Sequence, residues 1–144
     1  MTTKTENILA AVKTALAGTT GVGTKIYRSR VVPLTRNETP AIVIEPVSNN
    51  CDQNTGLNHL DWDLQLRILV IVRGSTTVSP YQAADPTLES LHAKMLVTSN
   101  LGGLAIDVQP IGHDYVFEDG DMPTAVISTN WVIKYRTLYT DLTQ

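Results

Sequence analysis

The strongest constraint on the fold is a stretch of alternating side chains at positions 60–73. One side of it carries only apolar residues, namely Leu60, Trp62, Leu64, Leu66, Ile68, Val70 and Val72. The other side is mostly polar, with Leu69 and Ile71 as exceptions. A period of two is typical of a β-strand with one buried face. At ~3.3 Å per residue a strand of about fourteen residues spans ~45 Å, against a usual length of ~5–6 residues. We therefore expect one end to project as a hairpin that contacts a neighbouring subunit.

A second alternating stretch, at positions 124–139, predicts another long strand. Residues 25–32 are rich in β-formers, and residues 41–45 form an apolar run that starts after Pro40 and stops at Pro46. Such a run indicates a strand covered on both faces. A shorter strand is predicted at 104–108, followed by an acidic hairpin with its turn at residues 119–121.

Two helices are predicted. The first covers residues 6–17, with Thr5 as N-cap and Gly18 after its end. The second begins at Asp85 and Pro86, which supply an N-cap and a proline in the first turn. Its apolar stripe has helical spacing and comprises Leu88, Leu91, His92, Met95 and Leu96.

This order of elements predicts one α+β domain over residues 1–144. Most strands follow one another without a helical crossover, which favours a mainly antiparallel or mixed sheet with both helices on one face. The 144 residues, 42% hydrophobic, suffice for a core. No stretch reaches the ~18 apolar residues of a membrane span, and a lone cysteine, Cys51, fits synthesis in a reducing cytoplasm. We expect a soluble, unprocessed chain.

Catalytic motifs are not found in the sequence, and no cofactor is expected. His59, Asp61 and Asp63 alternate along one strand face, which raises the alternative of a small metal-dependent enzyme. A solvated strand face accounts for them better, since no further ligand follows at a recognised spacing. His92 is expected to be partly buried and His113 to lie on the surface. Cys51 has no basic neighbour to activate it.

Charge is unevenly distributed along the chain. Eleven Lys and Arg against fourteen Asp and Glu give a net charge of −3, which disfavours nucleic-acid binding. Basic residues cluster around Arg28 and Arg30, whereas residues 107–121 contain five Asp or Glu and no Lys or Arg. We predict that the basic strand of one subunit faces the acidic hairpin of the next in a head-to-tail contact that closes into a ring. The predicted interface residues are Arg28, Arg30, Glu118, Asp119 and Asp121.

Two polar loops flank the first long strand, at residues 49–58 and 74–80. Polar loops held by rigid elements commonly carry contacts. We therefore predict that they contact partner proteins, with these candidate residues: Asn49, Asn50, Asp52, Asn54 and Arg73.

Several landmarks, in order and spacing, give the chain a family resemblance over nearly its whole length. They are Leu16-Ala17-Gly18, Tyr27-Arg28-Ser29-Arg30, Thr39-Pro40-Ala41-Ile42-Val43-Ile44, Arg73-Gly74, Ala84-Asp85-Pro86 before His92, Leu101-Gly102-Gly103-Leu104-Ala105 and Tyr135-Arg136-Thr137. The chain resembles the tail terminator (minor tail protein U-like) family of tailed bacteriophages. A head–tail joining or tail completion protein of the phage neck is the alternative within the same class.

The resemblance implies a homo-hexameric ring on the head-proximal end of the tail tube, assembled in the host cytoplasm. Such a ring ends tube polymerisation and presents the surface for the head–tail connector or stopper protein. Its implied partners are copies of itself, the tail tube protein and that connector or stopper. Genome DNA passes through the lumen without specific binding, and no membrane is involved.

Overall fold

The computed structural model describes residues 2–28, 40–52, 58–74, 78–97, 100–118 and 124–143. Its elements are α1 (Lys4–Leu16), β1 (Ile26–Arg28), β2 (Ala41–Asp52), β3 (His59–Arg73), α2 (Pro80–Leu96), the short 3₁₀ helix η2 (Leu101–Gly103), β4 (Asp107–Glu118) and β5 (Thr124–Leu138). The fold is α+β, with a five-stranded mixed sheet in the order β1-β2-β3-β5-β4. Only the β1–β2 pair is parallel. The predicted fold class is confirmed.

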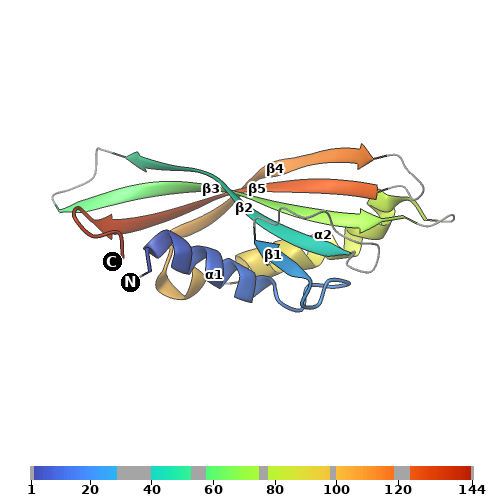
Figure 1. Ribbon diagram of the computed structural model, residues 1–144, viewed down its shortest axis with the longest axis horizontal. Helices are drawn as coiled ribbons and strands as arrows, with labels where there is room; N and C mark the ends of the chain where they lie inside the picture. The colour runs from blue at the N-terminus through green and yellow to red at the C-terminus, as the bar shows by residue number, and fades with distance from the viewer. Residues whose placement is uncertain are drawn as a thin grey trace.

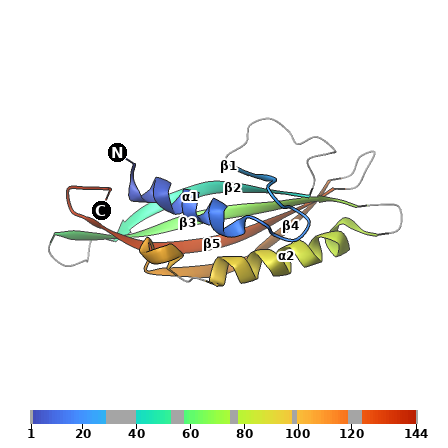
Figure 2. The same ribbon diagram turned by 90° about the horizontal axis from the view of Figure 1, so that it is seen from below.

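Both helices lie on one face of the sheet (Figures 1 and 2). The core forms between them and the alternate residues of β3 and β5 that point to this face. Trp131 and Leu66 are paired across these two strands and both are buried. The predicted stripe of α1 is buried as expected, in full Ile8, Leu9, Val12 and Leu16.

The two long strands have the lengths that the alternation predicted. β3 and β5 each have 15 residues and pair along their whole length, from His59 opposite Leu138 to Arg73 opposite Thr124. The hairpin end of β2 and β3 extends past the start of α1 (Figure 1). Exposed residues there include Asn49, Asn50 and His59. The core thus thins towards this end of the sheet.

Several predicted boundaries were wrong. α1 begins two residues early, because the Thr3 hydroxyl accepts a hydrogen bond from the amide of Glu6 and so caps the helix. α2 begins at Pro80 and not after Asp85, because Ser79 caps it in the same way and Pro80 takes the first helical position. Pro86 therefore lies inside the helix. Gly18 follows α1 with a φ of 81°, as predicted for a helix stop.

β2 and β4 are longer than predicted. β2 continues past Pro46 to Asp52 through a bulge between Pro46 and Ser48, where a missing amide hydrogen is tolerated. The predicted strand at 104–108 is wrong in position: β4 runs from Asp107 to Glu118 and has its own bulge beside Pro110. Residues 109–118, which were predicted only as part of an acidic hairpin, therefore belong to an edge strand of the described sheet.

The two bulges lie at the same level of the sheet. Pro46 is paired with Leu66, Leu66 with Trp131, and Trp131 with Pro110, so one row crosses four strands. A bulge adds local right-handed twist to its strand. The ribbons of β2 and β4 accordingly cross near the middle of the sheet in Figure 1.

Candidate assembly interface

β1 and β4 are the two edge strands and lie on opposite sides of the sheet. The described parts of the predicted basic and acidic segments, residues 25–28 and 107–118, thus lie at the two edges, far apart in this subunit. No contact between them is expected within one chain. This is the arrangement that a head-to-tail contact between copies requires.

Arg28, on β1, binds a carboxylate of its own chain. Its guanidinium donates two hydrogen bonds to Glu6 on α1, at 2.5 and 2.8 Å. These bonds lower the pKa of Glu6 and raise that of Arg28. Arg28 therefore fastens β1 to α1, and its predicted contact with a second copy remains a prediction. Arg30 lies outside the described residues.

The acids of β4 make only local contacts. The Asp107 carboxylate accepts hydrogen bonds from the Val108 amide and the Gln109 side chain, at 3.0 and 2.8 Å. Asp114 accepts one from Asn130, at 2.9 Å. Glu118 ends β4, and its side chain lies outside the described part, as do Asp119 and Asp121. Residues 107–117 contain no Lys or Arg, and Lys134 of β5 lies opposite Asp107 in the sheet.

Apolar side chains are exposed along β4 to a degree that the sequence analysis missed. Of the ten exposed large hydrophobic residues in the described chain, five lie at positions 106–117. They are Ile106 (57% exposed), Ile111 (59%), Tyr115 (57%), Val116 (50%) and Phe117 (50%). The sequence had predicted a short strand at 104–108 and then an acidic hairpin. The run of β-formers from Tyr115 to Phe117 was the available signal.

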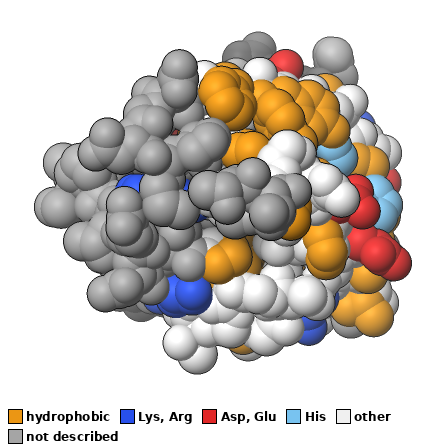
Figure 3. All heavy atoms as spheres, turned by 90° about the vertical axis from the view of Figure 1, so that its right-hand side faces the viewer, with side chains coloured by type: hydrophobic (Ala, Val, Ile, Leu, Met, Phe, Trp, Pro, Cys, Tyr) orange, Lys and Arg blue, Asp and Glu red, His pale blue; other side chains and the backbone are white. Residues whose placement is uncertain are grey.

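An aromatic cluster joins β4 to the start of α2. The Tyr81 ring lies 5.7 Å from that of Tyr115, edge to face, and 6.2 Å from that of Phe117. His113 approaches Tyr115 at 6.4 Å and is exposed, as predicted. Hydrophobic side chains gather at this end of the molecule, with acidic and histidine side chains beside them (Figure 3). We call Tyr81, Tyr115 and Phe117 the aromatic cluster.

The predicted contact residues near the β2–β3 tip are held mostly in a strand, not in a loop. Asn49 donates a 2.6 Å hydrogen bond to the Tyr135 hydroxyl, which also bonds Thr5 of α1 at 2.6 Å. Asn50 is exposed and donates to Ser48 at 3.4 Å. Asp52 ends β2, with its side chain outside the described part, and Asn54 lies outside it altogether. Asn49 thus has a structural role.

Arg73 ends β3, at the opposite end of the sheet. It is half-buried, and its Nε is buried without a hydrogen-bond partner among the described residues. A buried donor without an acceptor is costly. Among the predicted contact residues, Arg73 is therefore the one whose donor an acceptor from a partner protein could satisfy.

The face of the sheet without helices carries cross-strand ion pairs. Arg136 donates to both oxygens of Asp61, at 2.6 and 3.2 Å, and holds the pKa of that carboxyl below its ordinary value. Arg67 donates two hydrogen bonds to a single oxygen of Glu45, Oε2, at 3.2 and 3.0 Å. Opposite charges on neighbouring strands neutralise each other along this face.

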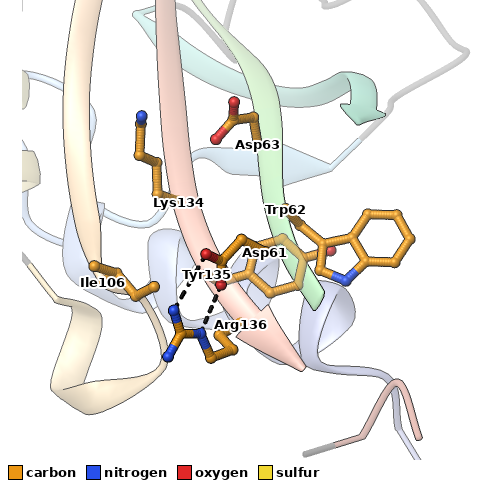
Figure 4. A pocket seen from close by; sticks show the side chains of 7 residues that line it. All are labelled: Asp61, Trp62, Asp63, Ile106, Lys134, Tyr135 and Arg136. Carbon is orange, nitrogen blue, oxygen red and sulfur yellow. Dashed lines mark hydrogen bonds and ion pairs between the residues drawn. The ribbon is translucent and has the colours of Figure 1, made fainter. Parts of the chain in front are cut away.

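A shallow hollow of about 280 Å³ surrounds the Asp61–Arg136 pair (Figure 4). Asp63 and Lys134 point to the same side, and Ile106 borders the hollow from the start of β4. Among the described residues no three His, Cys, Asp or Glu side chains form a group that suits a metal ion. Asp61 is bound to Arg136 in this structure, and the enzyme alternative stays a prediction.

A second shallow hollow, of about 300 Å³, lies between the two bulges and is lined by Val47, Ile111, Arg67 and Asn130, among others.

His92 was predicted to be partly buried but is exposed, because it lies at the margin of the apolar stripe of α2. Its ring lies 5.8 Å from that of Trp131.

No family model matches the chain, and no curated protein matches it. No helix among the described residues is long and apolar enough to cross a membrane.

Proposed function

We propose that this protein is a structural virion protein that forms a homo-hexameric ring at the head-proximal end of a phage tail tube. The ring ends tube polymerisation and provides the surface for head–tail joining. Its partners are the tail tube protein on one side and the head–tail connector or stopper protein on the other. The sequence resemblance to tail terminators supplies this assignment.

One structural observation supports it above the rest. The sheet ends in two unlike edges on opposite sides, a short β1 preceded by Lys25 and a long acidic β4. Unlike surfaces on opposite sides of a subunit are what a heterologous ring contact needs, because each copy then offers a different surface to each neighbour.

The charges also fit a ring through which DNA passes. A net charge of −3 and the paired charges on the open face offer no continuous basic surface for phosphates in the described part. Many phosphate contacts would produce strong, salt-dependent binding, which would hinder passage of the genome.

The decisive experiment removes the gene from the phage that carries it. If the protein ends tube polymerisation, infected cells will contain DNA-filled heads apart from tails that exceed the normal length. Tails of normal length that fail to join heads would instead indicate a joining or completion protein of the neck. Normal virions would contradict both assignments.

A second experiment uses the purified chain. Light scattering and negative-stain images should reveal rings of six subunits at high protein concentration or on added tail tubes. Metal analysis of the same sample tests the enzyme alternative, which requires bound metal and a loss of that metal in His59→Ala.

A further inference from the structure

β4 has two of the features that protect an edge strand, a proline and a bulge, but only near Pro110. The segment from Gly112 to Phe117 lies beyond them. Edge strands tend to be short or to carry lysines that block pairing with another chain. β4 has twelve residues and, in the described part of the chain, pairs with β5 alone. It contains no lysine, and only Pro110 lacks an amide hydrogen. A row of backbone donors and acceptors is thus left open.

The side chains of β4 make this edge suitable for burial from both faces. On the helix side, Tyr115 and Phe117 form the aromatic cluster with Tyr81. On the other side, Val116 is half exposed beside Val126 of β5. Apolar surface at one edge, on both faces, is typical of a sheet that continues into another chain.

Charge decides which strand of a second copy fits. Pairing of β4 with β4 about a two-fold axis, in the register that sets Asp107 opposite Asp114, would bring acids of two copies together. Lys134 of β5 lies opposite Asp107, but no cation lies opposite Asp114 in β5. Like charges across a strand pair are destabilising. The opposite edge of the sheet has Lys25 immediately before β1. Lys25 has no ion-pair partner among the described residues.

We propose that the outer edge of β4 pairs with β1 of a second copy, so that the sheets of neighbouring subunits become continuous. This inference rests on the proposed ring and names the strands that close it. Backbone hydrogen bonds supply the pairing, the aromatic cluster and Val116 supply apolar contact, and Lys25 facing the acids of β4 fixes the orientation.

The first test places a lysine on the proposed edge. Val116→Lys should abolish the six-subunit species in sedimentation velocity, because a buried lysine at the edge blocks strand addition. Val97→Lys is the matched control, since Val97 is 77% exposed at the end of α2 and Val116 is 50% exposed. The control should assemble like the unmodified chain. Circular dichroism of both variants verifies that they fold.

The second test separates head-to-tail pairing from pairing of β4 with itself. Asp114→Lys alone and Lys25→Glu alone should each raise the half-assembly concentration by more than about tenfold, because like charges then meet across the contact. A mixture of the two variants should assemble again, with alternating subunits, since every contact then joins a cation to an anion. Pairing of β4 with β4 predicts instead that Lys25→Glu alone assembles like the unmodified chain, because this change leaves β4 intact.

The outcomes distinguish this inference from the function it rests on. Rings from the unmodified chain together with rings from Val116→Lys overturn the edge pairing and leave the proposed function in place. So does assembly of Lys25→Glu alone at the same concentration as the unmodified chain. A monomer at every concentration, with or without tail tubes, overturns both. Loss of rings in Val116→Lys with rescue in the mixture supports the pairing.

Discussion

The two edges of the sheet differ in how firmly the subunit itself holds them. β1 is only three residues long, yet Ile26 is buried in the core and Arg28 is bound to Glu6 of α1. β4 has four times that length, and Val108 is its one buried side chain in the described part. Strand length alone therefore says little about how well a strand is anchored. What matters is the apolar surface that it buries and the side chains that tie it to its neighbours.

Replacing an isoleucine by alanine in β1 and in β4 should reveal the difference in anchoring between the two edges. Ile26→Ala removes a side chain that is 4% exposed, and we expect it to lower the free energy of unfolding by about 2–4 kcal/mol. Ile111→Ala, at the opposite edge and 59% exposed, should cost less than about 0.5 kcal/mol. Urea unfolding at dilutions where no assembly occurs measures both. Equal losses would contradict the comparison.

The aromatic cluster is the main side-chain anchor of the outer half of β4. Tyr115→Ala removes the edge-to-face contact with Tyr81, and we expect a loss of about 1 kcal/mol in the free energy of unfolding. Tyr139→Ala serves as the control, because Tyr139 is 68% exposed and has no ring contact in the described part. A loss as large in the control would mean that the cluster contributes nothing specific to β4.

Stability should depend on pH at the β1 edge through Glu6. Arg28 lowers the pKa of Glu6 from its ordinary value of 4.5, so the folded state binds the proton more weakly than the unfolded state. The stabilisation is complete above that ordinary value and is lost as pH falls through the lower folded pKa. Because both side chains are partly exposed to solvent, it should be less than about 1 kcal/mol.

Glu6→Gln measures this contribution. The variant should be slightly less stable than the unmodified chain at pH 7, and the difference should shrink as the pH falls below 4.5. Thermal unfolding across this range is sufficient. A difference that does not change with pH would mean that the ion pair has no part in holding β1.

The smallest effect on folding is expected at Asp114. Asp114→Asn keeps a side-chain oxygen that can accept the hydrogen bond from Asn130 but removes a charge from an exposed site. We expect the free energy of unfolding to change by no more than about 0.5 kcal/mol. Light scattering should nevertheless record weaker assembly than for the unmodified chain, since one attraction to Lys25 is lost. Unchanged assembly would argue against a role of this charge.

Much of the secondary structure follows from local sequence patterns. The alternation at 60–73 predicted β3 to within one residue, and helical spacing predicted the buried stripe of α1. Both patterns record which face of an element is buried, and this information lies within the element itself. The start of α2 was predicted wrongly because the same segment contains two residues that can act as N-cap, Ser79 and Asp85.

The candidate interface was only partly predictable. Uneven charge along the chain pointed to segments around Arg28 and Asp114, and the structure places them at opposite edges. The charge pattern could not reveal that Arg28 is already bound to Glu6, a residue 22 positions away. Nor did it reveal the aromatic cluster, because Tyr81 and Tyr115 meet only through the packing of α2 on the sheet.

The sequence by itself determined two long half-buried strands, two amphipathic helices and an uneven distribution of charge. Tertiary structure alone decided the order of the strands, and with it the exposure of β4. The physical reason is that alternation fixes the face a side chain points to, whereas neighbours in a sheet are chosen by pairing between distant segments. An edge exists only once all other strands have found their partners.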